Sequence, residues 1–314
     1  MKEMHGLMSV KRKIILVLLL AVVLNFAGGC GEKNNMAQKQ VPAEKQGLQI
    51  VTSFSILSDL VKNVAGDKAA VEYIVPIGEN PHDYEMLPSE LQKVTDADVF
   101  FINGFGLEGG MERILGNVTN TPVVSLSEGI TPIPIVGDDA PDPHAWLDAS
   151  LVITYVMNIR DTLISLDPDN KREYKHNAEV YINQLNELDS WIREQVAIIP
   201  QAKRIIVISE NAFKYYGKAY GFQTEGIWEL NSHEEGTPQQ ISRVVDLVTN
   251  KGLPAVFVET TVDKRYMQTI VNETGVPIAG AVYTDALGNK GSGADTYINM
   301  MKYNTEIFVK GLGN

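Results

Sequence analysis

Four short phrases, far apart in this sequence, each contain a side chain of a type that binds metal ions. They are Asn-Pro-His-Asp-Tyr-Glu at residues 80–85, Asp-Pro-His-Ala-Trp-Leu-Asp at 142–148, Ser-Glu-Asn-Ala-Phe at 209–213 and Tyr-Thr-Asp-Ala-Leu at 283–287. The candidate ligands are His82, His144, Glu210 and Asp285. Two imidazoles and two carboxylates suit a borderline or hard divalent ion, and no phrase offers the thiolate that a soft metal prefers. The sequence therefore predicts a bound divalent metal ion.

Each candidate also has a simpler structural explanation. His82 and His144 both lie in turns that contain proline, where a histidine is often a surface or partly buried structural residue. The helix N-terminus expected at Glu210 favours a carboxylate without any metal, and Asp285 is an ordinary turn residue at a strand end. Trp146 could shield a site or fill a gap in the core. A site is favoured because all four candidates follow predicted strands or lie in adjoining loops, two in each half of the chain.

The elements that must position these residues alternate between strands and helices. In the first half we expect strands at residues 48–53, 71–76, 98–102 and 122–126, with helices at 56–64 and from 89 onward. In the second half we expect strands at 204–209, 255–259 and 276–283, with helices at 212–220 and 264–274. This alternation predicts an α/β fold with two lobes of parallel sheet that face one another across a cleft.

A long helix is expected between the two lobes. Asp167 is the candidate N-cap, Pro168 would occupy the first helical position, and Pro200 marks the far end. Apolar residues then recur in steps of three and four, at Tyr174, Ala178, Tyr181, Leu185, Leu188, Ile192 and Val196. About 30 residues at ~1.5 Å each would make a rod of roughly 45 Å that joins the lobes. A coiled-coil partner helix is disfavoured because the repeat covers too few heptads.

The sequence of the N-terminus predicts an export signal followed by a membrane anchor. Residues 1–29 combine basic residues with an apolar run of 11 residues at 14–24, which is typical of a signal peptide and too short for a membrane span. The only cysteine, Cys30, follows Ala27-Gly28-Gly29 in a phrase that resembles a bacterial lipobox, although Ala27 stands where leucine is commonest. We expect Cys30 to be lipidated, which would anchor the protein on the extracytoplasmic face of a cell membrane. The alternative is an exposed thiol.

The predicted division of the chain follows from these features. It comprises a signal peptide at 1–29, the lipidated cysteine and a polar tether at 30–47, an N-terminal lobe at 48–166, a linking helix at 167–200 and a C-terminal lobe at 201–314. The formal charge is −12 for the whole chain and −15 once the four basic residues and one acidic residue of 1–29 are removed. Nucleic acid is therefore not an expected partner.

Taken together, the phrases resemble those of the cluster A-I metal-binding lipoproteins, the solute receptors of manganese, zinc and iron ABC importers. The resemblance runs from residue 48 to the C-terminus and also covers Pro-Ser-Glu at 88–90, Tyr-Tyr at 215–216, Ala-Tyr-Gly at 219–221 and Glu-Gly-Thr-Pro at 235–238, with Met86 as a departure. It implies that His82, His144, Glu210 and Asp285 are the metal ligands. It also implies two Rossmann-like lobes joined by one long helix, and delivery of the ion to an ABC permease by a protein that we expect to be a monomer.

The resemblance also bears on the metal. Zinc receptors of this family usually have histidine where this chain has Glu210, and many carry a histidine-rich loop, whereas residues 131–143 are acidic and apolar here. A carboxylate in that position hardens the site, so we expect Mn²⁺, with Zn²⁺ or Fe²⁺ as alternatives. The remaining histidines of the mature chain, His176 and His233, are expected to be solvated surface residues.

Two other classes of protein, a metalloenzyme and a surface adhesin, are less compatible with the sequence than a receptor. A metalloenzyme would need an open coordination position and a nearby acid or base, but four protein ligands leave little room for a substrate. The sequence also lacks a His-Glu-x-x-His pattern. A surface adhesin is suggested only by related lipoproteins, and no repeat supports it. We therefore expect a receptor that is not an enzyme.

Overall fold

The computed structural model describes residues 47–230 and 236–313. Residues Gly47–Asn314 form one compact unit. The predicted signal peptide, Cys30 and most of the tether lie outside the described residues, as does His233. The boundaries proposed for the two lobes and for the linking segment stay predictions.

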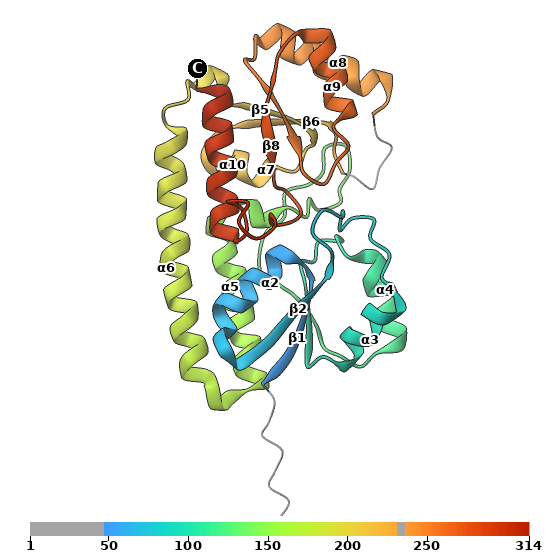
Figure 1. Cartoon of the computed structure of the whole chain (residues 1–314), viewed down its shortest axis with the longest axis vertical. Helices are drawn as coiled ribbons and strands as arrows, with labels where there is room; N and C mark the ends of the chain where they lie inside the picture. The colour runs from blue at the N-terminus through green and yellow to red at the C-terminus, as the bar shows by residue number, and fades with distance from the viewer. Residues whose placement is uncertain (1–46, 231–235, 314) are drawn as a thin grey trace, which may run out of the picture. The chain divides into compact units, whose positions relative to one another are not determined.

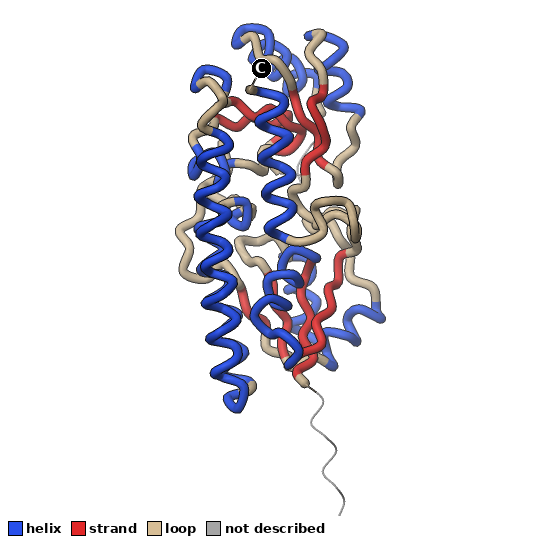
Figure 2. The backbone as a smooth tube through the Cα atoms, turned by 60° about the vertical axis from the view of Figure 1, so that its left-hand side comes forward, coloured by secondary structure: helices blue, strands red, loops and turns tan. Residues whose placement is uncertain are grey.

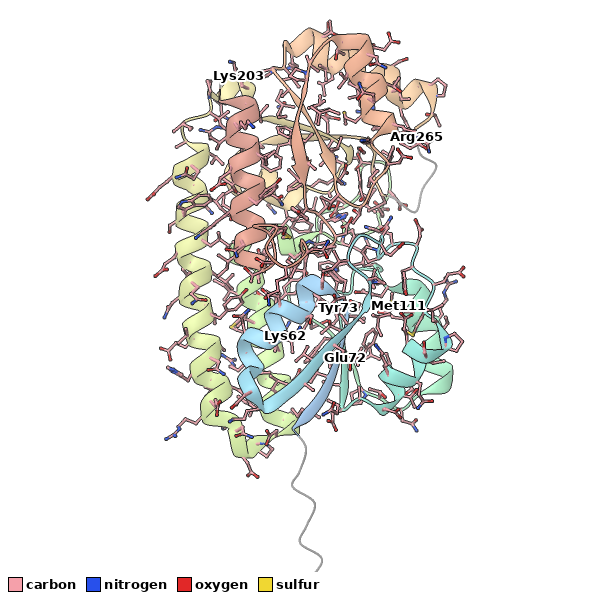
Figure 3. The ribbon with its side chains drawn as sticks, in the orientation of Figure 1. Lys62, Glu72, Tyr73, Met111, Lys203 and Arg265 are labelled. Carbon is pink, nitrogen blue, oxygen red and sulfur yellow. The ribbon has the colours of Figure 1, made fainter. Side chains whose placement is uncertain are left out.

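The N-terminal strands form one continuous parallel sheet (Figure 1). Its strands are β1 (Leu48–Phe54), β2 (Ala69–Val75), β3 (Val99–Ile102) and β4 (Val123–Ser125), in the order β2-β1-β3-β4. The helices of this region are α2 (Ser55–Ala65), α3 (Pro88–Asp96) and α4 (Gly109–Val118), with α5 (Ala149–Leu166) following. Met111, labelled in Figure 3, is a buried side chain of α4 that belongs to the main core. All four predicted strands are present, whereas α4 and α5 were not predicted as separate helices.

The C-terminal strands form two parallel pairs rather than one sheet. One pair joins β5 (Ile205–Glu210) to β6 (Gln223–Trp228), and the other joins β7 (Val256–Glu259) to β8 (Ile278–Val282). Strands β5 and β7 lie side by side without a shared ladder. The helices are α7 (Lys214–Tyr220), α8 (Pro238–Lys251), α9 (Arg265–Thr274) and α10 (Tyr297–Leu312). The prediction missed β6, α8 and α10.

A long helix, α6 (Lys171–Val196), packs against α2, α5 and α10, and Figure 2 shows it running beside the rest of the molecule. It has 26 residues, so its length is about 39 Å. Its buried residues are the seven that the spacing predicted: Tyr174, Ala178, Tyr181, Leu185, Leu188, Ile192 and Val196. Asp167 is not its N-cap, because a short 3-10 turn, Pro168–Asn170, intervenes and Asn170 precedes the helix. Instead, Asp167 Oδ2 accepts hydrogen bonds from Asn170 Nδ2 and from the hydroxyl of Tyr174.

One large hydrophobic core extends through both regions. It combines the N-terminal sheet and its helices with α5, α6, α7 and α10, and a smaller cluster lies among β5 to β7, α8 and α9. Phe308 of α10 packs edge-on against Phe213 and Phe257, with ring centroids 5.0 Å apart in each pair. Within the described part of the chain, no helix is both long and apolar enough to cross a bilayer.

Candidate metal centre

The four candidate ligands meet in one buried cluster. One donor atom from each of His82, His144, Glu210 and Asp285 lies within 4.8 Å of all the others. The side chain of His82 is 4% exposed, and the other three are fully buried. Since buried charges are costly unless they are paired or bind a metal, this burial is strong evidence for a site. The structure thus brings together the four residues that the sequence predicts as ligands.

The two ligands from the N-terminal region come from loops. His82 lies in the loop after β2, where its backbone N–H donates to Asn80 Oδ1 at 2.9 Å and closes a local turn. His144 lies far beyond β4, directly before the 3-10 turn Ala145–Leu147. Local turns rather than strand ends therefore position both imidazoles.

The two ligands from the C-terminal region lie at or near strand ends. Glu210 is the last residue of β5, and it does not begin a helix as we expected, because α7 starts only at Lys214. Asp285 lies three residues beyond the end of β8 at Val282. These carboxylates therefore face the imidazoles from the carboxyl ends of parallel strands, which is where such sheets place ligands.

The donor atoms are spaced as a common metal ion would require. The Nε2 atoms of His82 and His144 are 3.4 Å apart, and Glu210 Oε1 lies 3.5 Å from the first and 3.7 Å from the second. Asp285 Oδ1 lies 3.5 Å from His144 Nε2. Ligands placed about 2.1 Å from one ion in a tetrahedron are separated by about 3.4 Å. The cluster therefore has the right size for a first-row divalent ion.

Asp285 supplies a further indication of a ligand. Its Oδ2 accepts hydrogen bonds from the hydroxyls of Thr284 at 3.1 Å and Thr261 at 3.4 Å. Among the described residues no hydrogen-bond donor is recorded for its buried Oδ1, and the nearest partner given is His144 Nε2 at 3.5 Å. A buried carboxylate oxygen without a donor is costly, and a metal ion in the cluster would satisfy it.

The ring of His144 is oriented by a carboxylate that the sequence did not single out. Asp142 Oδ1 accepts a hydrogen bond from His144 Nδ1 at 3.0 Å, and its Oδ2 accepts one from Lys214 Nζ at 2.8 Å. Lys214 also pairs with Glu229 at 2.7 Å. With the proton held on Nδ1, Nε2 is left to face the cluster. Lys214 thus links the C-terminal region to the loop that carries His144.

The charges of the cluster strongly affect protonation in the metal-free protein. Burial alone would lower the pKa of His144, but the carboxylates of Asp142 and Glu210 raise it well above its ordinary range. Burial opposes ionisation of Asp285 as well, yet the nearby His144 lowers its pKa. A proton on the imidazole therefore offsets the carboxylates in the place where a metal cation would do so. Metal binding must displace that proton.

Trp146 lies between the site and the core, so it both shields the site and fills space in the core. Its ring lies 5.2 Å from that of His144 and 5.1 Å from that of Phe54. Its indole Nε1 donates to the carbonyl of Thr284, next to Asp285, at 2.8 Å. One side chain therefore contacts a ligand from the first half and the backbone beside a ligand from the second. His176 is exposed on α6, as the sequence predicted, and it does not belong to the cluster.

Comparison with known proteins identifies the family. The model of the family described as zinc-uptake complex component A, periplasmic, matches residues 50–311. The chain belongs to this family. It is 54% identical over 301 residues to the manganese-binding lipoprotein MntA of Halalkalibacterium halodurans, covering 96% of this chain and 99% of that protein. The family resemblance drawn from the sequence is confirmed.

Solved structures agree with this assignment. The Mn-bound periplasmic metal binding protein of Candidatus Liberibacter asiaticus has a TM-score of 0.78 at 26% identity, over 84% of this chain and 99% of that chain. The periplasmic zinc binding protein TroA of Treponema pallidum has a TM-score of 0.80 at 26% identity, over 85% and 99%. The α/β fold with parallel sheets and one long helix is therefore confirmed. The members of the family are substrate-binding components of metal importers, and this chain belongs to it.

Proposed function

We propose that this protein captures Mn²⁺ through His82, His144, Glu210 and Asp285 and delivers it to the permease of an ABC importer. The observation that carries the proposal is the buried cluster of two imidazoles and two carboxylates, with donor atoms within 4.8 Å of one another. The names of relatives support the class of protein, since MntA is a manganese-binding lipoprotein and PsaA of Streptococcus mitis a manganese ABC transporter substrate-binding lipoprotein.

The donor set favours manganese over zinc. Carboxylate and imidazole ligands suit Mn²⁺, and each carboxylate can add its second oxygen to raise the coordination number above the four that Zn²⁺ prefers. The zinc-uptake family model and the zinc-binding TroA make Zn²⁺ the second candidate. Intrinsic affinity is also higher for Zn²⁺ than for Mn²⁺, so tight zinc binding alone would not identify the transported ion.

The rest of the proposal concerns location and partners. Lipidation of Cys30 would hold the protein on the extracytoplasmic face of the membrane, within reach of the permease. The protein would act there as a monomer. We propose that α6 limits the motion on metal binding to local loop shifts, because its buried face packs against α2, α5 and α10. A large compaction in small-angle scattering on adding metal would contradict that limit.

A competition titration tests the choice of metal. The metal-free chain is titrated with Mn²⁺, Fe²⁺ and Zn²⁺, alongside Glu210→His and the matched control His176→Ala on exposed α6. We expect reversible submicromolar Mn²⁺ binding by the wild type and by the control, and loss of Mn²⁺ with retention of Zn²⁺ by Glu210→His. Exchangeable tight binding of Zn²⁺ alone would reassign the protein to zinc uptake. Absence of binding by every ion would reject the site.

A further inference from the structure

One buried carboxylate connects the two strand pairs of the C-terminal region by hydrogen bonds. Glu259, the last residue of β7, is 3% exposed. Its Oε1 accepts a hydrogen bond from the backbone N–H of Glu210 at 2.7 Å, and its Oε2 accepts one from that of Ser209 at 3.3 Å. These amides lie at the end of β5, where no ladder connects β5 to β7. The Glu259 side chain thus supplies the acceptors that a neighbouring strand would supply in a continuous sheet.

The position of these amides gives Glu259 a link to the site. One of the two N–H groups belongs to Glu210 itself and the other to the residue before it. Hydrogen bonds to a carboxylate are shorter and roughly twice as strong as those between neutral groups, and the contact with Glu210 N–H, at 2.7 Å, has that length. The pair therefore fixes the backbone from which the Glu210 carboxylate projects, and a shift of that backbone moves the carboxylate directly.

The N-terminal region contains a matched case without a ligand. Glu108 is 1% exposed, and its Oε1 accepts hydrogen bonds from Ser53 Oγ and from the backbone N–H of Asn103, both at 2.7 Å. Its Oε2 accepts one from the N–H of Gly104 at 3.1 Å. Glu108 therefore does the same kind of backbone capping at the end of β3. Its connection to a candidate ligand is less direct, because none of the groups that it holds belongs to a ligand and only Asn103 Nδ2 donates to the carbonyl of Pro143, next to His144.

We propose that Glu259 is a positioning residue of the metal site, which holds the Glu210 carboxylate at the place where the ion binds. This inference rests on the proposed function in that Glu210 must bind the ion. Glutamine in place of Glu259 keeps the size but has one acceptor oxygen, and its amide NH₂ would face one of the two backbone N–H groups. Two donors then oppose one another, so the end of β5 must move.

The test compares three proteins, each as the full chain in detergent: wild type, Glu259→Gln and Glu108→Gln. The measurements are Mn²⁺ affinity, the electron paramagnetic resonance spectrum of bound Mn²⁺, and the melting temperature of the metal-free form. We expect Glu259→Gln to weaken Mn²⁺ binding by about 10- to 100-fold, the range for residues that orient metal ligands, and to change the spectrum. We expect Glu108→Gln to lower the melting temperature about as much as Glu259→Gln does. Its Mn²⁺ affinity, however, should stay within about threefold of wild type.

Several outcomes would overturn the inference. Equal losses of affinity in both variants would reduce Glu259 to a stability role, and so would wild-type affinity in Glu259→Gln. If Glu259→Gln does not fold, Glu259→Asp takes its place, since aspartate keeps two acceptors at shorter reach. We then expect a smaller loss of affinity, and an unchanged affinity would contradict the proposal. Failure of the wild type to bind Mn²⁺ would instead count against the proposed function, and the same comparison would be made with Zn²⁺.

Discussion

The N-terminal and C-terminal regions hold their candidate metal ligands in different ways. The first has four strands in one continuous sheet, and both of its candidate ligands, His82 and His144, come from loops. The second has two separate strand pairs, and its ligands lie at or near strand ends. Where a ladder is missing, the backbone amides must find other acceptors, and Glu259 provides them. On one side of Glu210 the backbone pairs with β6, whereas on the side of β7 the Glu259 side chain accepts its N–H in place of a strand.

The two regions are nevertheless joined around the site. Trp146 donates to the Thr284 carbonyl, and the hydroxyl of Tyr215 donates to the carbonyl of Asp142 at 2.8 Å. Lys214 pairs with Asp142 across the same boundary. Because these contacts surround the ligands, the geometry of the cluster depends on both regions at once.

The largest expected effect comes from removing one ligand from each region. We expect His144→Ala and Asp285→Ala each to lower metal affinity by more than about 100-fold, because the loss of a residue that only orients a ligand already costs about 10- to 100-fold. Calorimetric titration of both variants measures this. Affinity within tenfold of wild type in either variant would show that the residue removed does not bind the ion.

The aromatic cluster around Phe308 should be the next most sensitive feature. Phe308→Ala would remove a fully buried ring that packs on Phe213 and Phe257, where no strand ladder helps to join the elements. We expect a loss of about 3 to 5 kcal/mol in the free energy of unfolding, measured by guanidinium denaturation. Ile198→Ala is the control, because Ile198 is 64% exposed and should change stability by less than about 0.5 kcal/mol. A loss below about 0.5 kcal/mol in Phe308→Ala would show that this aromatic cluster does not stabilise the region.

The ion pairs of Lys214 test the connection between the regions. Lys214→Met leaves the buried Asp142 carboxylate without its lysine, and we expect stability to fall by about 2 to 3 kcal/mol. The expected loss is at or below the lower end of the range of about 3 to 5 kcal/mol for breaking a buried ion pair. The reason is that the second partner of Lys214, Glu229, is partly exposed, so solvent screens that pair. Thermal unfolding of the metal-free protein measures the loss. Lys93→Met is the control, since its pair with Glu72 is exposed on the N-terminal region and should contribute little. Equal effects of the two variants would contradict the expected role of Lys214.

The smallest expected effect is a change in the pH dependence of stability. Burial raises the pKa of Glu108 to about 7 from an ordinary value of 4.5, so the folded state keeps a proton that the unfolded state has released. This contribution to stability is present below the unfolded pKa and is lost as pH rises through about 7. We expect Glu108→Gln to make the decline between about pH 5 and pH 7 shallower, by up to about 1.4 kcal/mol per pH unit.

Denaturant titrations of the metal-free protein at several pH values measure this slope. Part of the decline should remain in the variant, because burial also raises the pKa of Glu259 to about 7. Parallel curves for wild type and Glu108→Gln would contradict the prediction.

The sequence alone determined the features that depend on local patterns. Spacing in steps of three and four predicted the buried face of α6, from Tyr174 to Val196, because a helix repeats its faces over a few residues. Runs of apolar residues between turn signals predicted strands β1 to β5, β7 and β8. The types of His82, His144, Glu210 and Asp285, together with their places after strands, indicated a metal site. The polar start and internal glycine of β6 hid that strand from the same reasoning.

Only the tertiary structure decided which distant groups meet. Glu259 lies 49 residues from Glu210, and Lys214 lies 72 residues from Asp142, so no local pattern could show that they are partners. The break between β5 and β7 was equally invisible, since each strand has an ordinary strand sequence. Asp167 shows the same limit at short range, because it bonds Tyr174 instead of capping α6. Local sequence sets what each segment can form, whereas hydrogen bonds and burial between distant segments decide which side chains act together.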